Sequence, residues 1–310
     1  MDACGERFVI VSGDSRAEVD EVGAALAGFS QGGRVRVEPH PPTARPPKGS
    51  GAVLAPWPNR VRGGAWTHRG TRRQLALTEP DAGNAIHGLL RHVTWTPVER
   101  AGDRITLTAV APVQPGWPQP VRVTVTYAVG RDGLTVTTVV ENLGDAPVPF
   151  GLGFHPYLRV GDVPTDELEL TLSARTELPL RDQLPDGPAR PLDGAVSRTR
   201  LAGLVLDSAF GGCTPGDGPD GGADGRVRHR VGSRDGGGTE LWADAAFGWV
   251  QVFTPSDFPR QGPDGAVTPS RAIAVEPMTC PPDALNSGTD LIELVPGESQ
   301  VLRWGVHATG

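Results

Sequence analysis

The histidine near the middle of the chain is the side chain best suited to acid–base chemistry. His155 lies in residues 148–158, between Gly151, Gly153 and Pro156. Glycine lets the backbone approach a ligand or adopt angles closed to other residues, and proline fixes the conformation directly after the imidazole. An imidazole so held can exchange a proton near neutral pH, because its unperturbed pKa is about 6.5. The alternative is a buried histidine bonded only to backbone groups, so the interpretation depends on partners elsewhere in the chain.

Four further segments place an ionisable side chain beside glycine, proline or an apolar run. The side chains are those of Arg60, His87, Asp207 and Glu276. Asp207 and Glu276 follow apolar runs, where an ionised carboxylate is costly unless it is paired or hydrogen-bonded. Each of the four also has a structural interpretation: a turn-capping arginine, a loop histidine, an aspartate held by turn amides and a glutamate facing water. Taken singly, none of them decides between the two roles.

The elements that must position these side chains are predicted to be strands. The 310 residues include 42 Gly and 31 Pro, and the apolar segments are short, which is typical of strands joined by turns. Runs at 104–110, 121–129 and 134–141 alternate apolar and polar residues, and Gly-Arg-Asp-Gly at 130–133 favours a hairpin. Further candidate strands are 8–11, 168–174, 204–210, 226–231, 239–243, 248–254, 271–276 and 301–307. We therefore predict an all-β fold, a large antiparallel β-sandwich with few short helices.

Two segments do not follow this simple strand pattern. Residues 17–29 carry apolar side chains at a spacing that favours an amphipathic helix, although two glycines weaken that interpretation. Residues 211–238 are crowded with Gly, Asp and Arg. We interpret them as surface loops around a possible strand, because candidate strands of similar character lie on both sides. The chain is accordingly predicted to form a single domain over residues 1–310.

Composition excludes several classes of partner. The net charge of −7 argues against nucleic acid, since binding phosphate needs a basic face. No stretch approaches the roughly 20 apolar residues that span a bilayer, and no signal peptide is evident. The three cysteines, Cys4, Cys213 and Cys280, are far apart and form no CxxC pair that would suggest zinc or a redox motif. We expect a cytoplasmic protein with reduced thiols.

Taken in order, the chemically capable segments resemble the aldose 1-epimerases, the galactose mutarotase family. The likeness runs from about residue 8 to residue 307, and as an ordered pattern of five parts it is highly specific. It is nearest to the bacterial branch that reads Pro-Trp-Pro-Asn-Arg early and Glu-Pro-Met-Thr-Cys-Pro-Pro-Asp-Ala late. The matching segments are Pro58-Asn59-Arg60, Asn84 to Gly88, Gly153-Phe154-His155-Pro156-Tyr157, Leu206-Asp207 and Val275-Glu276-Pro277, with Pro282-Asp283-Ala284 and Asn286 downstream.

This resemblance implies a supersandwich of β-strands that binds a monosaccharide, an aldohexose, in a cleft without cofactor or metal. It also implies that residues 17–29 are mainly strand, and we adopt that expectation over the helical one. In the family's reaction a glutamate removes the proton of the anomeric hydroxyl while a histidine protonates the ring oxygen, so the ring opens and recloses as the other anomer. On the matching positions Glu276 would be the base and His155 the acid. The sugar hydroxyls would be held by Arg60, His87 and Asp207.

The residue types suit this chemistry. Opening a hemiacetal needs one proton removed and another delivered, and positioned acid–base groups contribute about 10²–10⁴-fold each. Apolar neighbours at 272–275 would desolvate Glu276 and raise its pKa, which makes it a stronger base, whereas a neighbouring arginine would oppose that shift. Reversibility favours pKa values near the working pH for both groups. The chain could work as a monomer or a homodimer.

Two other functions remain open on the sequence. A glycoside hydrolase on a similar sandwich would use two carboxylates about 5–9.5 Å apart, and Asp207 with Glu276 could supply them. In that case His155 and His87 would have no assigned role. A protein that only binds sugars would keep the fold but would not need an acid–base pair.

The sequence also leaves the details of the sugar open. An anionic sugar, phosphorylated or sulfonated, would need additional arginines in the cleft, and the candidates are Arg62, Arg72, Arg73 and Arg91; the alternative for each is solvated surface charge. A tryptophan could offer a face for the sugar ring, although core or rim packing is its commoner role. The candidate tryptophans are Trp57, Trp95 and Trp242.

Overall fold

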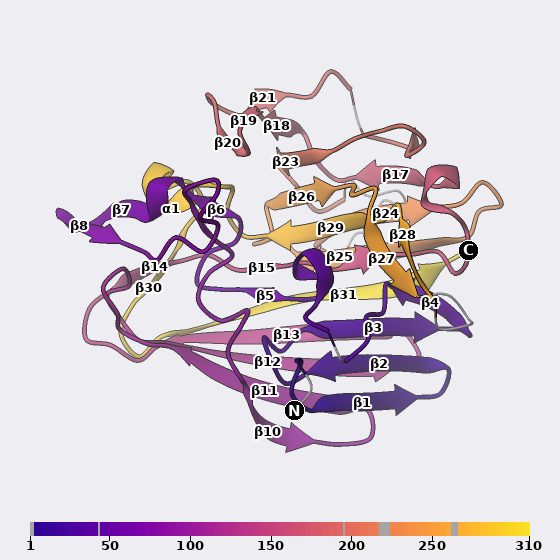
Figure 1. Ribbon diagram of the computed structural model, residues 1–310, viewed down its shortest axis with the longest axis horizontal. Helices are drawn as coiled ribbons and strands as arrows, with labels where there is room; N and C mark the ends of the chain where they lie inside the picture. Colours follow the sequence, from indigo (N-terminus) through magenta and orange to yellow (C-terminus); the bar gives the residue numbers. More distant parts are fainter. Residues whose placement is uncertain (1–2, 43, 195, 217–223, 262–265) are drawn as a thin grey trace.

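The computed structural model describes residues 3–42, 44–194, 196–216, 224–261 and 266–310. Within these residues two large antiparallel sheets account for most of the strands (Figure 1). The predicted all-β sandwich with few short helices is confirmed. The helical segments of the described residues are one α-helix and three 3₁₀ turns: α1 (Ala284–Ser287), η1 (Pro47–Gly49), η2 (Arg62–Gly64) and η3 (Thr165–Glu167). None of the described helices has the length and apolar character needed to cross a membrane.

The first sheet is the one that carries most of the candidate site. Its main path begins at the N-terminal strands and continues through segments from the middle and end of the chain. In order it contains β1 (Arg7–Ser12), β2 (Ser15–Asp20), β3 (Leu26–Gln31), β4 (Arg34–Val37), β16 (Tyr157–Leu158), β29 (Ile273–Met278), β26 (Trp249–Phe253), β23 (Asp207–Gly211), β18 (Thr176–Leu178) and β21 (Arg190–Pro191). Two short strands, β15 (Gly153–Phe154) and β5 (Val53–Leu54), extend it beside β29.

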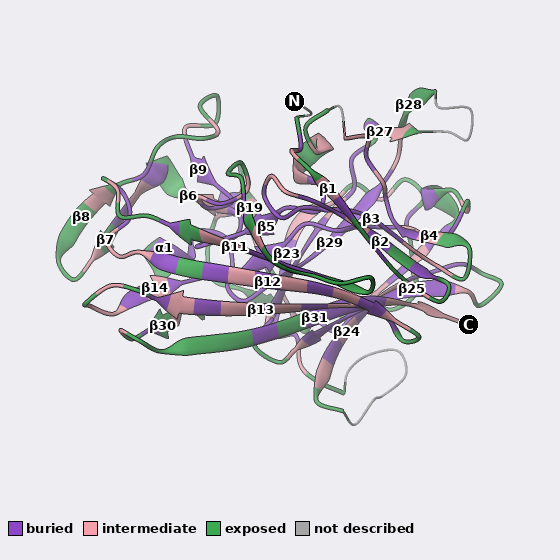
Figure 2. Ribbon diagram, turned by 90° about the horizontal axis from the view of Figure 1, so that it is seen from below, coloured by how far each residue is buried: buried purple, intermediate pink, exposed green. Residues whose placement is uncertain are grey.

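The second sheet covers the first. It consists, in order, of β10 (Thr96–Arg100), β11 (Arg104–Ala111), β12 (Val121–Gly130), β13 (Gly133–Asn142), β31 (Ser299–Thr309), β25 (Gly238–Asp244), β24 (Arg226–Gly232), β17 (Glu169–Leu172) and β22 (Thr199–Arg200). Alternation along β12 follows the predicted pattern, because every second residue from Val121 to Val129 is buried (Figure 2). The predicted hairpin is also confirmed: Gly130 pairs with Gly133 across a two-residue turn.

Apolar side chains from the facing surfaces of both sheets form one core. It includes Ile10 of β1, Val125 of β12, Val252 of β26 and Val306 of β31, each at most 1% exposed. Burying a side chain of this size stabilises the fold by about 1.5–3 kcal/mol, so the inward faces fix how the sheets stack. The outward face of the first sheet is then free to carry polar groups where its central strands meet.

Residues 17–29 form a hairpin, so the helical expectation from their spacing is wrong. They span β2, a turn and β3, and Gly23 and Ala24 in the turn have positive φ angles of 73° and 46°. The register pairs Val19 with Leu26, and both side chains are fully buried. Strand pairing across the turn brings these apolar residues together. Their spacing alone does not distinguish such a hairpin from an amphipathic helix.

The Gly-rich region supplies strands of the second sheet in addition to loops. The possible strand at 226–231 is confirmed as β24, which pairs with β25 and β17. The predicted loop over residues 217–223 lies outside the described residues.

Short two-stranded sheets lie beyond the two large sheets, several of them at the end of the molecule that also holds α1 (Figure 1). Among the described residues these pairs are β6 (Arg60–Val61) with β9 (Ala85–Ile86), β7 (Ala65–His68) with β8 (Thr71–Gln74), β14 (Val148–Phe150) with β30 (Ile292–Leu294), β19 (Leu180–Arg181) with β20 (Leu184–Pro185), and β27 (Phe258–Gln261) with β28 (Val267–Ser270).

Candidate active site

Strand register brings His155 and Glu276 together. Gly153 pairs with Met278 and Tyr157 pairs with Ala274, so His155 falls opposite Glu276 on the neighbouring strand. The imidazole Nε2 lies 3.3 Å from a carboxylate oxygen of Glu276. Both side chains are buried, at 4% and 2% exposure. The arrangement places a proton donor and a proton acceptor side by side.

The histidine is held on both sides by backbone contacts. The backbone N–H of His155 donates to the carbonyl of Ala52, and the backbone carbonyl of His155 accepts a hydrogen bond from the N–H of Gly51. Gly49 packs against the ring: a Cβ at this position would lie 3.1 Å from the imidazole Cδ2. The ring of Tyr157 stacks on the other side with a centroid separation of 5.2 Å. These contacts fix the direction of the imidazole.

The glutamate belongs to a polar row across three strands. Glu276 on β29 pairs directly with Gln251 on β26, and the Gln251 amide donates a 2.6 Å hydrogen bond to Asp207 on β23. The three strands lie next to one another in Figure 1. Because side chains alternate along a strand, Val275 points into the core while Glu276 points to the opposite face. The row therefore lies on the face turned away from the sandwich core.

Arg60 and His87 approach from outside the sheet. Arg60 lies on β6 opposite Ile86 of β9, and His87 follows directly. Asn59 ties the two segments together, because its N–H donates to His87 Nδ1 at 3.1 Å and its carbonyl accepts from the His87 N–H at 2.8 Å. With Nδ1 acting as acceptor, the neutral imidazole carries its proton on Nε2. Gly88 has a φ of 72°, and a Cβ there would lie 2.0 Å from the Ala55 carbonyl oxygen, so the close turn requires glycine.

The guanidinium of Arg60 is fixed by a residue that the sequence analysis did not single out. Its Nε and Nη2 donate to the two carboxylate oxygens of Glu79 at 2.8 and 2.9 Å. A bidentate pair of this kind is stronger and more directional than a single contact. Glu79 therefore sets the direction of Arg60.

All five candidate residues line one cavity of about 400 Å³, a volume in the range of small-molecule sites. Sequence reasoning missed much of its wall, including Gln251, Glu79 and Gln183. Arg91, one of the four candidate arginines, lines the cavity, whereas Arg62, Arg72 and Arg73 do not. Within the described part of the chain, the lining consists of Lys48, Gly49, Asn59, Arg60, Thr78, Glu79, Ile86, His87, Arg91, His155, Gln183, Asp207, Gln251, Phe253 and Glu276.

Burial dominates the electrostatics of the site. It raises the pKa of Glu276 well above the ordinary value, the Asp207 carboxylate adds to that effect, and Arg60 opposes it. Burial lowers the pKa of His155. His87 also has a pKa well below the ordinary value, through burial and then the nearby charges of His155, Arg91 and Arg60. The cavity therefore favours a protonated glutamate beside a neutral imidazole over separated charges.

Several buried polar atoms in the site have no hydrogen-bond partner among the residues that the structure describes. They include Glu276 Oε2 and Gln251 Oε1, and both residues line the cavity. An unsatisfied buried polar atom is costly. These atoms can accept hydrogen bonds from donor groups of a bound ligand.

The candidate tryptophans do not form the cavity wall. Trp57, Trp95 and Trp242 are 2%, 0% and 4% exposed, and none is part of the lining. Trp242 lies under the guanidinium of Arg226 at 3.8 Å. Packing is the role the structure gives all three, and Phe253 supplies the aromatic surface of the cavity.

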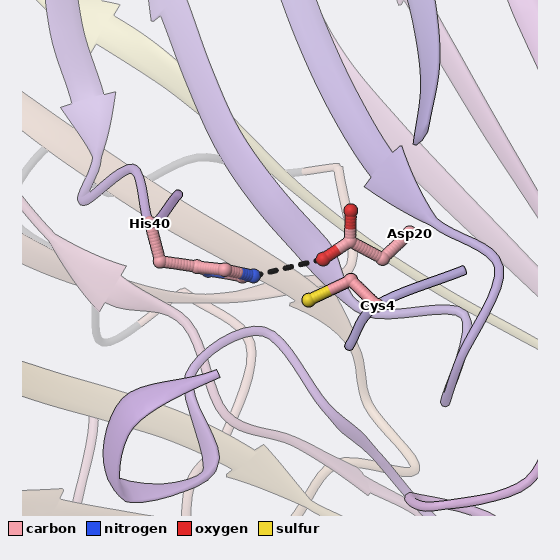
Figure 3. A group of neighbouring side chains, drawn as sticks. All are labelled: Cys4, Asp20 and His40. Carbon is pink, nitrogen blue, oxygen red and sulfur yellow. Dashed lines mark hydrogen bonds and ion pairs between the residues drawn. The ribbon is translucent and has the colours of Figure 1, made fainter. Parts of the chain in front are cut away.

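Cys4, Asp20 and His40 form a second buried cluster, away from the cavity (Figure 3). Their donor atoms lie within 4.8 Å of one another, close enough to hold a metal ion. However, Arg7 bonds to both oxygens of Asp20 at 2.7 and 3.1 Å, and His40 Nε2 lies 2.9 Å from the same carboxylate. Burial raises the pKa of the Cys4 thiol to about 12. The cluster is an ion-pair network that joins the N-terminal segment to β2.

Comparison with known proteins identifies the family. Residues 6–304 match the family model described as aldose 1-epimerase, and the chain belongs to that family. An uncharacterized protein of Escherichia coli K12, YihR, is 30% identical over 312 residues, covering 99% of this chain and 94% of the relative. Family membership and fold together support a mutarotase-like isomerase function.

Solved structures share the fold. A putative aldose 1-epimerase from Escherichia coli K12 superposes with a TM-score of 0.78 at 21% identity, covering 98% of each chain. A galactose mutarotase-like protein from Clostridium acetobutylicum gives 0.82 at 16% identity, covering 97% of this chain and 94% of the other. The aldose epimerase homologue from C. elegans gives 0.81 at 18% identity, covering 98% of each chain.

Proposed function

We propose that the protein is an aldose 1-epimerase that interconverts the α and β anomers of an aldohexose by acid–base opening and closing of the ring, without a cofactor. The observation that carries the proposal is the pairing of His155 with Glu276 at 3.3 Å in a polar cavity of about 400 Å³. A hemiacetal has its two reacting oxygens on one carbon, so a donor and an acceptor this close can serve both.

In the ring-opening direction Glu276 acts as the base and His155 as the acid. The Glu276 carboxylate takes the proton of the anomeric hydroxyl, whose oxygen becomes the carbonyl oxygen as the bond between C1 and the ring oxygen breaks. The departing ring oxygen takes the electron pair of that bond and the proton from His155. Rotation about the C1–C2 bond and reversal of these steps give the other anomer.

The number of protons on the two side chains is the same before and after ring opening. Before opening, the pair is a carboxylate and an imidazolium; afterwards it is a carboxylic acid and a neutral imidazole. Both states hold the same number of protons, so the cycle needs no exchange with solvent. The neutral state is the one that burial favours, and it is also the state that closes the ring.

The remaining candidates are assigned to binding. His87 presents its protonated Nε2 as a donor, Asp207 is an acceptor held by Gln251, and Arg60 keeps donors beyond the two that bond to Glu79. Glu276 lies between the other two residues: Asp207 lies on one side of it, across β26, and His155 lies on the other side. Asp207 is therefore assigned to the hydroxyl at C2, the neighbour of the anomeric carbon.

The test is the rate at which freshly dissolved α-glucose or α-galactose approaches equilibrium, followed by polarimetry. Catalysed relaxation of either sugar, or of a related aldose, supports the proposal, and relaxation no faster than the buffer blank for all of them refutes it. Aryl glycosides are the companion substrates, because Asp207 and Glu276 both line the cavity. Release of the phenol would indicate a glycoside hydrolase instead. Tight sugar binding without either reaction would indicate a protein that only binds sugars.

A further inference from the structure

One nitrogen of the His155 imidazole has no described partner. Nε2 faces Glu276 at 3.3 Å, whereas Nδ1 is buried and has no hydrogen-bond partner among the residues that the structure describes. An acceptor on the second ring nitrogen commonly orients a catalytic histidine and stabilises its imidazolium form. In the proposed reaction His155 passes through that form, so its charge must be stabilised by another contact.

The surroundings of the ring oppose the cation. Burial lowers the pKa of His155 to about 3, and the charge of Arg91 adds to this effect. The ring of His87 lies edge-on to it with centroids 5.6 Å apart, and burial lowers the pKa of His87 as well, so this neighbour adds no negative charge. Among these neighbours the Glu276 carboxylate is the counter-charge in contact with His155.

The aromatic ring of Tyr157 supplies a second favourable contact. It stacks on the imidazole with ring centroids 5.2 Å apart and planes 25° apart. The face of an aromatic ring is electron-rich and attracts a cation within about 6 Å of its centroid. This attraction is strongest while the imidazole is protonated, so it favours the state that opens the sugar ring over the neutral state.

Tyr157 is held in place from several directions. Its side chain is fully buried, and the ring of Phe258 packs against it at a centroid distance of 4.5 Å. Its hydroxyl donates a 3.2 Å hydrogen bond to the carbonyl of Lys48. The next residue, Gly49, is the one that packs against the His155 ring. Tyr157 therefore also ties down the loop that limits the movement of the imidazole.

We propose that Tyr157 is a positioning residue of the epimerase site, whose ring face orients the His155 imidazole and stabilises its protonated form in place of a hydrogen bond at Nδ1. This inference rests on the proposed epimerase function. The phenol donates no proton to the sugar, because its hydroxyl is bonded to Lys48 and Tyr157 is not among the described residues that line the cavity. Burial also raises the pKa of this phenol, and the charge of Glu276 adds to that effect.

Substitution of Tyr157 separates the ring face from the hydroxyl. Tyr157→Phe keeps the face and loses the bond to Lys48, so kcat should stay within about threefold of wild type. Tyr157→Leu removes the face, and kcat should fall about tenfold, within the range of one desolvated cation–π contact. KM should change by less than about threefold in both, because Tyr157 does not touch the sugar. Polarimetry over a range of sugar concentrations gives both constants.

Fluorination of the ring is the sharper experiment, because it withdraws electrons from the ring face with little change in size. Position 157 is occupied in turn by phenylalanine, a monofluorinated phenylalanine and a trifluorinated phenylalanine, each incorporated at an amber codon. We expect kcat to fall stepwise as fluorine is added, by about tenfold in all, at a nearly constant KM. A residue that only packs against the imidazole would give equal kcat values across the series.

Tyr127 is the matched control, because it is the other of the two tyrosines in the chain. It is also fully buried, and its hydroxyl donates to the carbonyl of Ala24 at 2.7 Å. It lies on β12 of the second sheet and outside the described lining of the cavity. Tyr127→Leu makes a comparable hole in the protein, so kcat per folded molecule should stay near wild type, with the folded fraction measured by circular dichroism.

The outcomes separate this inference from the proposed function. Unchanged kcat in Tyr157→Leu, equal kcat across the fluorinated series, or an equal loss in Tyr127→Leu overturns the role of Tyr157 while the epimerase stands. If Tyr157→Leu does not fold, the fluorinated series decides, since its rings are similar in size. Failure of the wild type to accelerate anomer exchange in any aldose overturns the epimerase and this inference with it.

Discussion

His155 and Glu276 face each other across paired strands, with the imidazole Nε2 3.3 Å from the carboxylate. The pairing is set by backbone register, since Gly153 and Tyr157 on one side are matched with Met278 and Ala274 on the other. A change of register by one residue would send one of the two side chains to the core face. The geometry of the proposed reacting pair is therefore a property of the sheet.

Removing either member of this pair should abolish most of the activity. We expect Glu276→Gln and His155→Asn each to lower kcat by about 10²–10⁴-fold with a much smaller change in sugar affinity. In the proposed reaction the two groups act as one relay, so the double variant should be little slower than either single variant. Anomer exchange gives kcat, and calorimetric titration with sugar gives affinity. Near wild-type rates in a single variant would contradict the assigned roles.

Glu79 should act on binding through Arg60. Glu79→Gln removes the charge that holds the guanidinium at 2.8 and 2.9 Å, so Arg60 loses its fixed direction. We expect KM to rise by about tenfold, the size of one charged hydrogen bond, with kcat within about threefold of wild type. Glu99→Gln is the control, because Glu99 pairs with Arg104 on the exposed surface. An equal effect of the two substitutions would rule out a role for Glu79 in positioning.

Gly49 should be needed for the orientation of His155. Gly49→Ala adds a methyl group 3.1 Å from the imidazole Cδ2, which forces the ring to shift, and we expect kcat to fall about tenfold because acid catalysis depends on position. Gly63→Ala is a matched control: its φ of 62° is similar to the 76° of Gly49, and a Cβ there meets nothing within 4 Å. Both variants carry a backbone cost of about 1–2 kcal/mol, so thermal melting should agree and only kcat should differ.

The buried pair should make stability depend on pH. Burial raises the folded-state pKa of Glu276 above its unfolded value, so between these two values the folded chain holds a proton that the unfolded chain releases. Unfolding free energy therefore falls as pH rises above about 4.5, by at most about 1.4 kcal/mol per pH unit. Glu276→Gln lacks this loss and should become more stable relative to wild type as pH increases from 4.5 to 7. Denaturant titrations at several pH values check this, and parallel curves would contradict it.

His155 should make the unfolding free energy fall as the pH is lowered, which is opposite to the effect of Glu276. Burial lowers its folded-state pKa, so as pH falls below about 6.5 the unfolded chain gains a proton that the folded chain excludes. Stability from this group is lost toward acid pH. In His155→Asn that loss should disappear, while the decline above pH 4.5 that comes from Glu276 should persist.

Local pattern was sufficient for much of the fold. Alternation at 121–129 and the Gly-Arg-Asp-Gly turn predicted β12 and its hairpin with β13, because these depend on neighbours in sequence. The apolar spacing at 17–29 was misleading because it depends only on positions along the chain and does not show that two strands pair. Val19 and Leu26 meet across a turn, and a helix would also have placed them on one face.

The candidate site was predictable only as a set of residue types in order. That His155 lies opposite Glu276 follows from pairing between segments more than 100 residues apart, which no local pattern encodes. Gln251 and Glu79 carried no signal, since a glutamine in an apolar strand and a glutamate before a proline are common. The sequence could not show which of the four candidate arginines reaches the cavity. In the folded chain Arg91 lines the cavity and the other three do not.

The proposed reacting pair belongs to the sheet, whereas Arg60, His87, Arg91 and Gln183 reach the cavity from short two-stranded sheets and loops. This separation allows evolution, or an engineer, to retune which sugar is accepted without disturbing proton transfer. Exchanging the segment around Arg91 for one from a relative alters a loop in the cavity wall and leaves the register of β29 untouched. The proposed proton transfer and the part of sugar recognition that comes from the loops can therefore change independently in this scaffold.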